Sequence, residues 1–316
     1  MKEYAFGIDL GGTTAKIGLF TTAGDLLEKW EVPTDTSDKG IRILPNLAAA
    51  VQDKMAQRGL TADQVEGVGL GVPGPILGAS VVSIVCANLG GWGDCDAGAQ
   101  LSQLLGGIRV LVGNDANVAA LGEIWMGAAK GCRSAVMVTL GTGVGGGIVV
   151  DGQLIEGAHG AGGEIGHITV NPDEPAQCGC GKHGCLEQYS SATGVVRCMN
   201  KLLEENPDTP CTLRGTAFAA KDVFDAARSG DQLARQEVED MALTLALALG
   251  NIAVITDPEM FLVGGGVARA GEVLLEPLNR HYQSHAFVSC RSIPICQASL
   301  GNDAGIYGAV RLIVGA

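Results

Sequence analysis

The pattern of apolar and polar positions divides the chain into short strands and longer helices. Apolar runs bounded by turn residues predict strands at 5–20 (a hairpin around a glycine turn), 65–72, 81–86, 108–112, 135–150 (a second hairpin) and 260–263. Longer mixed patterns predict helices at 45–58, 117–126, 221–228, 232–249 and 271–282. Because strands and helices alternate, we predict an α/β fold built in layers.

The two predicted hairpins share one design. Residues 5–20 and 135–150 each contain an apolar strand, the pair Leu-Gly, a turn of small residues and a second apolar strand. This weak internal similarity predicts two half-molecules of similar design, each beginning with a β-hairpin.

Composition narrows the class of protein. The 316 residues are 47% hydrophobic, enough for the core of one large or two ordinary domains. The 48 glycines exceed the usual share of roughly 7% and cluster in loops, which indicates close approach of backbone to a ligand. A net charge of -13 disfavours nucleic acid and anionic membranes as partners, because both attract basic surfaces.

Cysteine content and hydropathy indicate in which cellular compartment the protein is expected. No charged-then-apolar signal segment opens the sequence, so we expect a cytoplasmic protein whose ten cysteines are mostly free thiols. The uniformly apolar run 241–256 is shorter than the ~20 residues that cross a bilayer. We therefore expect a core or interface helix there, and no membrane partner.

One short glycine-rich stretch gathers metal-binding side chains. One imidazole and three thiolates close a tetrahedral Zn²⁺ shell, so we predict a structural zinc site with four ligands: His167, Cys178, Cys180 and Cys185. Such a site would hold the neighbouring Glu164 and Glu187 in fixed places. Two alternatives remain: His183 as a competing ligand, and buried free thiols without a metal.

A glycine turn near the start of the sequence suits a phosphate group. In Asp9-Leu-Gly-Gly-Thr13-Thr14-Ala-Lys16, glycines let backbone N–H groups face an anion and threonine hydroxyls add donors. The predicted nucleotide contacts in this turn are Asp9, Gly11, Gly12, Thr13, Thr14 and Lys16, with Asp9 holding Mg²⁺ through water. The alternative is a tight hairpin, with Lys16 solvated at a strand edge.

Other glycine clusters are weaker signals. Residues 141–146 and 69–74 both match the dinucleotide fingerprint, yet neither is followed directly by a helix, which that fingerprint requires. We predict instead that Thr142 and Gly143 meet the same nucleotide as the first hairpin. A third cluster, Gly264, Gly265 and Gly266, would pack against adenine or ribose, or else form a strand-to-helix turn.

Polar side chains of short reach supply a pocket for hydroxyl groups. Asp115 follows an apolar strand and precedes a helix, and Asn117 can cap that helix, which leaves Asp115 and Asn114 available. Carboxylates and amides pair well with hydroxyls, which both donate and accept. The predicted set is Asn88, Asn114, Asp115, Glu164, His167 and Glu187.

Taken together, these motifs resemble the ROK family of bacterial sugar kinases and repressors, across essentially the whole chain. The matching segments are Asp9-Leu-Gly-Gly-Thr-Thr, Gly71-Val-Pro-Gly-Pro75, Asn88-Leu-Gly-Gly-Trp92, Asn114-Asp115-Ala-Asn117, Leu140-Gly-Thr-Gly-Val-Gly-Gly-Gly147, Glu164-Ile-Gly-His167 and Cys178-Gly-Cys180-Gly-Lys-His-Gly-Cys185-Leu-Glu187. The resemblance is greatest to the ATP-dependent glucokinases of that family.

The resemblance implies an actin-like ATPase (ribonuclease H-like) fold with two α/β domains around a cleft. We expect a smaller domain at 1–118 plus 302–316 and a larger one at 119–301. It also implies transfer of the γ-phosphoryl group of MgATP to the 6-hydroxyl of glucose, with Asp115 as catalytic base. Asn88, Asn114, Glu164, His167 and Glu187 would hold the sugar, and His167 would face both zinc and sugar.

The resemblance leaves alternatives open. Another hexose (N-acetylmannosamine, mannose or fructose) could be the acceptor, and polyphosphate could replace ATP. A sugar-sensing ROK repressor is disfavoured, because the first hairpin begins near Met1 and the net charge is -13. The family and the apolar run 241–256 suggest a homodimer or homotetramer.

Overall fold

The computed structural model describes residues 2–315, without the side chains of residues 84, 85 and 87. The chain forms two compact units. Unit 1 consists of Met1–Arg133, Gly147–Gly163 and Ser299–Ala316, and unit 2 consists of Ser134–Gly146 and Glu164–Ala298. The domain boundaries expected from the sequence, 1–118 plus 302–316 and 119–301, stay a prediction.

A mixed five-stranded sheet forms the centre of unit 1. Its order is β3-β2-β1-β4-β8, with bounds Leu26–Pro33, Thr14–Thr21, Tyr4–Leu10, Val65–Val72 and Val110–Asn114. The first three strands are antiparallel, whereas β4 and β8 run parallel to β1. The predicted first hairpin and the strand at 65–72 are therefore confirmed.

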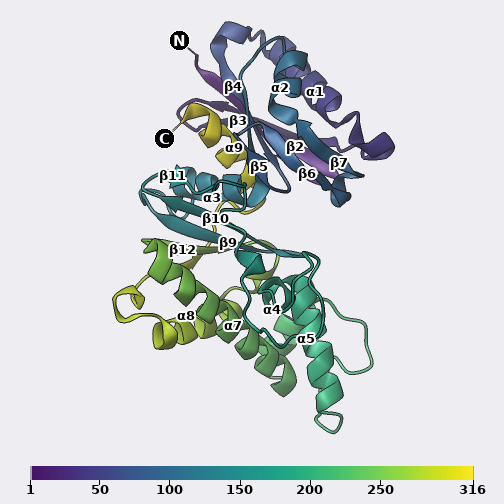
Figure 1. The fold of residues 1–316 in the computed structure, drawn as a ribbon, viewed down its shortest axis with the longest axis vertical. Helices are drawn as coiled ribbons and strands as arrows, with labels where there is room; N and C mark the ends of the chain where they lie inside the picture. The colour runs from purple at the N-terminus through teal and green to yellow at the C-terminus, as the bar shows by residue number, and fades with distance from the viewer. Residues whose placement is uncertain (1, 316) are drawn as a thin grey trace. The chain divides into compact units, whose positions relative to one another are not determined.

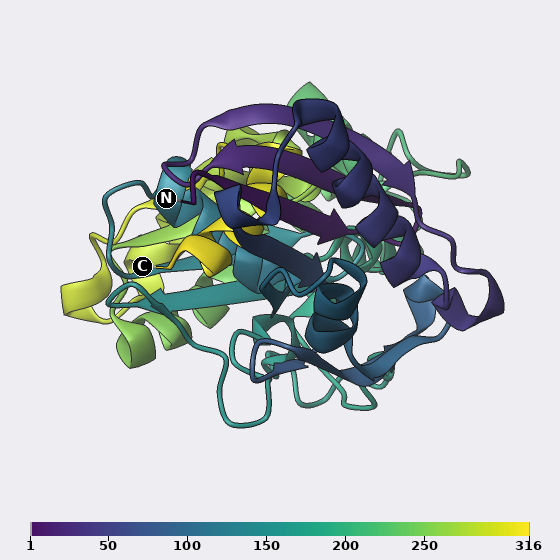
Figure 2. The same cartoon turned by 90° about the horizontal axis from the view of Figure 1, so that it is seen from above.

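Unit 1 also contains four α-helices and a small sheet among its described residues (Figure 1). The helices are α1 (Ile43–Arg58), α2 (Ala97–Leu104), α3 (Asp115–Met126) and α9 (Ala304–Val314). The small antiparallel sheet contains β5 (Ile76–Leu77), β6 (Val81–Cys86) and β7 (Trp92–Asp96). Seen from above, α1 runs alongside the strands of the first hairpin (Figure 2).

Helix α9 packs directly against the backbone of its neighbours. A Cβ on Gly7 of β1 would lie 2.1 Å from the carbonyl oxygen of Ile306, and one on Gly69 of β4 would lie 1.8 Å from that of Ala309. A Cβ on Gly308 would lie 1.4 Å from the carbonyl oxygen of Val118 in α3. These three glycines lie in strands and a helix rather than in loops, and they permit close helix–strand and helix–helix packing.

Glu123 ties α3 to the segment that leads into α9. Its side chain is fully buried, and its carboxylate accepts backbone N–H bonds from Ala128 (2.8 Å), Ser299 (3.1 Å) and Leu300 (2.7 Å). The hydroxyl of Ser299 donates a further bond. All of these residues belong to unit 1, so the buried carboxylate links two segments within that unit.

The second large sheet follows the same plan. Its order is β11-β10-β9-β12-β13, with bounds Gln153–Leu154, Val144–Val150, Ala135–Leu140, Met260–Gly264 and Ile295–Gln297. The boundary between the two units falls within β10. Strands β9 and β10 form the second predicted hairpin, and β12 runs parallel to both β9 and β13.

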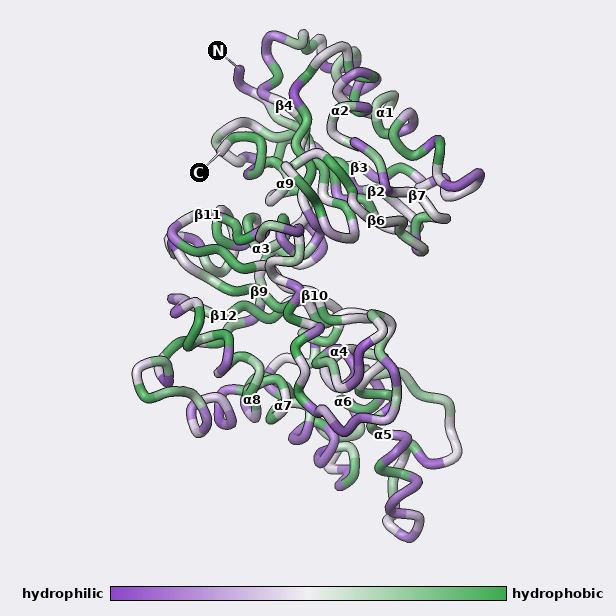
Figure 3. Tube along the Cα trace, viewed as in Figure 1, coloured by the Kyte–Doolittle hydropathy of each residue, from purple (hydrophilic) through white to green (hydrophobic). Residues whose placement is uncertain are grey.

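Helices make up most of the rest of unit 2. They are α4 (Glu187–Ser190), α5 (Ala192–Glu205), α6 (Ala220–Ser229), α7 (Gln232–Thr256) and α8 (Glu272–His285). The tube is mainly hydrophobic along β9 and more hydrophilic toward the outer end of α5 (Figure 3). Apolar residues of α5 recur at Val195, Met199 and Leu203, which are all buried.

Helix α7 is longer than the apolar run seen in the sequence. It has 25 residues, so the judgement that this segment is too short to span a membrane is wrong on length, and its composition also permits a span. However, half of its most apolar window is buried within the protein, and it packs against α8, α6 and α5. These contacts are typical of a core helix.

Candidate functional site

The end of β8 places Asn114 and Asp115. Because β8 pairs with β4 as far as Val72↔Asn114, the strand runs two residues beyond the predicted end at Val112. The side chain of Asn114 then accepts the N–H groups of Ala116 (3.0 Å) and Asn117 (3.1 Å) and caps α3. The prediction that Asn117 is the cap is therefore wrong; Asn117 is buried inside the helix.

Asp115 is the first residue of α3, and its side chain is exposed. One carboxylate oxygen accepts the N–H of Ala116 at 2.8 Å, a bond that orients the group at the positive end of the helix. The amide of Asn114 donates to the carbonyl oxygen of Gly74 at 3.2 Å. A strand end and a helix start thus fix two of the predicted site residues side by side.

The first glycine turn lies against another predicted site residue. A Cβ on Gly12 would lie 2.8 Å from the carbonyl oxygen of Asn88, so only glycine brings the turn this close to the 3₁₀ turn Ala87–Leu89. Thr13 and Thr14 are exposed at the tip, as is Asn88. Exposed hydroxyls beside a glycine backbone suit an anion.

The two charged residues of this turn differ in environment. Burial raises the pKa of Asp9, while Lys16, its partner across the β1–β2 pair, opposes that shift. Lys16 donates to the carbonyl oxygen of Asn302 and lies 3.6 Å from the carboxylate of Asp303. The ammonium group of Lys16 is therefore tied to the segment before α9 rather than solvated at a strand edge.

The four predicted metal ligands come together in unit 2. The imidazole of His167 and the thiols of Cys178, Cys180 and Cys185 offer atoms that all lie within 4.8 Å of one another. Ligand atoms around one tetrahedral Zn²⁺ stand about 3.7 Å apart, and the 3.6 Å between the sulfurs of Cys180 and Cys185 agrees with that spacing. Burial raises the pKa of Cys185 to about 12. The donor set and geometry fit zinc.

The two imidazole nitrogens of His167 face different groups. Nδ1 lies 3.9 Å from the sulfur of Cys178, whereas Nε2 lies 4.0 Å from the carboxylate of Glu164. His183 does not join the cluster, because its Nδ1 lies 3.0 Å from the carbonyl oxygen of Glu174. The proposal of His183 as a competing ligand is therefore wrong.

Glu187 connects the thiol cluster to the second glycine turn. One carboxylate oxygen accepts the N–H of Val144 at 3.0 Å, and the other lies 3.7 Å from the sulfur of Cys178. A Cβ on Gly143 would lie 2.2 Å from the same carboxylate, so a larger residue there would displace the side chain of Glu187. The neighbouring Thr142 is exposed, and its carbonyl oxygen accepts a bond from the hydroxyl of Thr193.

The third glycine cluster follows β12. Gly265 has a φ of +85°, and a Cβ there would lie 2.5 Å from the carbonyl oxygen of Leu140. Gly266 has open space where a Cβ would stand and leads into the 3₁₀ helix Val267–Ala270. The cluster thus forms a strand-to-helix turn, which was one of the two alternatives predicted for it. It lies beside the end of β9, the strand that leads to Thr142.

One supporting network was missed by the sequence reading. The carboxylate of Glu174 is only 8% exposed; it pairs with both terminal nitrogens of Arg197 at 3.2 Å and accepts the hydroxyl of Tyr189. Arg197 also donates to the carbonyl oxygen of Gln188, next to Glu187. This network ties α5 to the loop that carries the four predicted metal ligands. No local motif marks it, because its members are spread over 24 positions.

Comparison with known proteins agrees with this arrangement. The ROK family model matches residues 5–315. A glucokinase of Halalkalibacterium halodurans is 40% identical over 311 residues, covering 97% of this chain and 94% of that protein. The crystal structure of a ROK family glucokinase from Streptomyces griseus, in complex with glucose and AMPPNP, has a TM-score of 0.77 at 33% identity and covers 98% of both chains.

A ROK hexokinase structure from Thermus thermophilus has a TM-score of 0.81 at 32% identity, covering 97% of this chain and 96% of that one. The two mixed sheets and the two-unit organisation agree with these structures, so the predicted actin-like ATPase fold with two α/β domains is confirmed. The match spans nearly every residue, and the chain belongs to the ROK family.

Proposed function

We propose that this chain is a glucokinase, which transfers the γ-phosphoryl group of ATP to the 6-hydroxyl of glucose and yields glucose 6-phosphate. The observation that carries the proposal is its 40% identity to a bacterial glucokinase over 97% of the chain. The local geometry supports it, because both units present polar side chains of the type that a ring of hydroxyls needs.

Asp115 is the proposed catalytic base. Its exposed carboxylate at the start of α3 would accept the proton of the 6-hydroxyl as the oxygen attacks the γ-phosphorus in line. Water is the competing acceptor, so its exclusion from the site would favour transfer to sugar. The residues proposed to hold the other hydroxyls are Asn88, Asn114, Glu164, His167 and Glu187.

The glycine turns are the proposed nucleotide contacts. The exposed backbone and hydroxyls of the first turn would contact phosphate groups, and Asp9 would hold Mg²⁺ through water. Mg²⁺ would neutralise charge on the transferring phosphoryl group. The full proposed set is Asp9, Gly11, Gly12, Thr13, Thr14, Lys16, Thr142, Gly143, Gly264, Gly265 and Gly266. Within it, Lys16 would act from its anchored position beside Asp303.

Zinc is the proposed structural metal of unit 2, with His167, Cys178, Cys180 and Cys185 as ligands. The closed donor set leaves no position for a reacting water, so the ion would supply rigidity rather than chemistry. By holding Nδ1 of His167, it would leave Nε2 free to face a sugar hydroxyl.

The central test replaces Asp115 by Asn. The change keeps the shape and the helix start but removes the proton acceptor, so turnover should fall by ~10²–10⁴-fold while glucose binding persists. Steady-state kinetics and calorimetry with glucose would measure the two effects. Asp53→Asn on α1 is the control, because that side chain is exposed and outside the proposed site. Near-normal turnover of Asp115→Asn would remove Asp115 from its role.

The zinc proposal has a test that does not depend on activity. Cys180→Ser should lose the metal, so elemental analysis should find about one zinc per wild-type chain and far less in the variant. Proteolysis of the segment between His167 and Glu187 should accelerate together with that loss. Cys95→Ser in unit 1 should retain the metal. An equal metal content in all three proteins would refute the assignment.

Substrate choice within the family requires a separate assay. Coupled ADP release over glucose, mannose, fructose and N-acetylmannosamine should give the highest kcat/KM for glucose. Replacing ATP by polyphosphate tests the donor. A clear preference for another hexose would retain the kinase and correct its acceptor.

A cytoplasmic homodimer or homotetramer is the proposed state. On unit 2, Val254 (57%), Ile255 (81%), Phe287 (60%) and Val288 (68%) are unusually exposed for large apolar residues. We propose that a second copy of the chain packs against these four residues. Light scattering should give a mass above 32.3 kDa for the native protein and a smaller mass for Ile255→Lys.

A further inference from the structure

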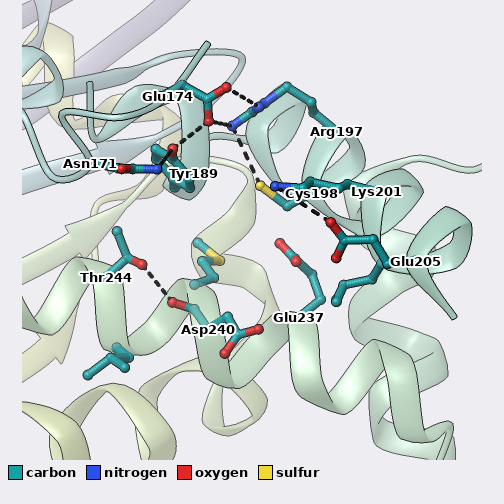
Figure 4. A pocket seen from close by; sticks show the side chains of 13 residues that line it. Asn171, Glu174, Tyr189, Arg197, Cys198, Lys201, Glu205, Glu237, Asp240 and Thr244 are labelled. Atoms are coloured by element: carbon teal, nitrogen blue, oxygen red, sulfur yellow. Dashed lines mark hydrogen bonds and ion pairs between the residues drawn. The ribbon is translucent and has the colours of Figure 1, made fainter. Parts of the chain in front are cut away.

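Unit 2 contains a pocket that the proposed kinase reaction does not use. It has a volume of about 380 Å³ and lies between α5, α7 and the loop that leads to α4 (Figure 4). None of the residues proposed to bind sugar, nucleotide or zinc lines it. The lining combines acidic groups with the apolar side chains of Leu202, Met241 and Leu243.

Glu237 of α7 is the unusual member of the lining. Its side chain is 2% exposed and directed into the pocket (Figure 4). Among the described residues, no hydrogen bond or ion pair to this carboxyl group is present. Ionising a buried acid without a partner is costly, since the charge would have no counter-ion. Something that enters the pocket can supply what the protein does not.

The other charges of the pocket are largely compensated in pairs. Arg197 is held by both carboxylate oxygens of Glu174 at 3.2 Å, and Lys201 lies 3.7 Å from the carboxylate of Glu205. Asp240, one helical turn after Glu237, forms no ion pair among the described residues. Among the described residues that line it, the pocket therefore has two carboxyl groups on α7 without an ion pair, whereas Arg197 and Lys201 each have an acidic partner.

We propose that this pocket is a binding site for a small organic cation, a primary ammonium group on a short apolar body. The ammonium would pair with Glu237 and Asp240, and the apolar body would pack on Leu202, Met241 and Leu243. A bare metal ion fits less well, because the volume exceeds what one ion needs and part of the wall is apolar.

The wall of the pocket is shared with the loop that carries the proposed metal ligands. Arg197 donates to the carbonyl oxygen of Gln188 at 2.9 Å, and the hydroxyl of Tyr189 donates to Glu174. The pocket thus adjoins this loop, but none of the proposed metal ligands lines it. Binding can be measured directly, so its failure is distinguishable from a failure of the kinase proposal.

The experiment compares n-butylamine with 1-butanol, which has the same apolar body and no charge. In an NMR or calorimetric titration of the full chain, n-butylamine should bind saturably at millimolar concentration and 1-butanol should bind at least about tenfold more weakly. Equal binding of the two probes, or no saturable binding of the amine, would overturn the proposal.

Three matched variants locate the site. Glu237→Gln should weaken n-butylamine by about tenfold or more, because a charge-assisted bond is lost. Asp240→Asn, whose side chain is exposed and safe for folding, should weaken it by about threefold. Glu204→Gln removes an exposed charge outside the lining and should change nothing. Equal affinities in Glu237→Gln, Asp240→Asn and wild type would place the amine elsewhere and reject the site.

Discussion

Two buried glutamates, one in each unit, have opposite environments. Glu123 is fully buried and accepts three backbone N–H groups and a hydroxyl. Glu237 is 2% exposed and faces a pocket, and its carboxyl group accepts no hydrogen bond from the described residues. Burial alone therefore does not reveal the role of an acid. A carboxylate whose hydrogen bonds are satisfied stabilises the fold. One without partners destabilises it, and a ligand that supplies a partner can offset that free-energy cost.

The largest expected effect is at Glu123. Glu123→Gln keeps the shape but turns one oxygen into a donor that faces backbone N–H groups, so it leaves them unsatisfied. We expect a loss of about 2–4 kcal/mol in the free energy of unfolding, measured by urea denaturation. A variant as stable as wild type would show that these bonds do not hold the segment before α9.

The same substitution at Glu237 should have the opposite sign. Burial, and then the neighbouring Asp240, raise its pKa from 4.5 to about 9, while Arg197 lowers it. The folded state thus retains a proton that the unfolded chain releases, and wild-type stability falls as pH rises between those two values. Glu237→Gln avoids this loss, so its advantage should be absent near pH 4.5 and grow by up to about 1.4 kcal/mol per pH unit.

Denaturation at pH 5 and pH 8 would measure that difference. The other titratable groups that line the pocket are Glu174, Tyr189, Arg197, Cys198, Lys201, Glu205 and Asp240. Arg197 is paired with Glu174, and Lys201 lies 3.7 Å from the carboxylate of Glu205. A variant no more stable than wild type at pH 8 would mean that water or a counter-ion already solvates the wild-type acid.

The smallest effect is expected at Glu239, also on α7. Its side chain is 45% exposed and pairs with Arg280 at 2.6 Å and His281 at 2.8 Å. Exposed pairs contribute little, because water competes for both charges, so Glu239→Gln should cost no more than about 1 kcal/mol. A larger loss would show that exposure is a poor guide to these acids and weaken the comparison.

Much of the framework could be predicted from the sequence, because its strands are apolar runs between turns. Strands β4 and β6 have the predicted bounds, and both hairpins form. Helix α9 was not predicted, since Gly305 and Gly308 lower its helix propensity and only packing against β1, β4 and α3 stabilises it. Helix α5 was missed although Val195, Met199 and Leu203 give a usable helical spacing.

The candidate site was predictable where its residues are close in sequence. The thiol cluster converges as expected, because short glycine-rich spacing limits how far its members can separate. The choice between Asn114 and Asn117 as helix cap depended on pairing of β8 with β4, which is a long-range contact that no local pattern encodes. For the same reason the Glu174–Arg197 pair and the isolation of Glu237 were visible only in the structure.

The packing of α9 has a consequence for synthesis on the ribosome. The first two hairpin strands emerge early, yet the helix that covers Gly7 and Gly69 is translated almost the whole chain later. Until then, the nascent sheet exposes an apolar face that other chains can contact. Variants of α9 should therefore first increase the need for chaperones during translation, before they lower the stability of the folded protein.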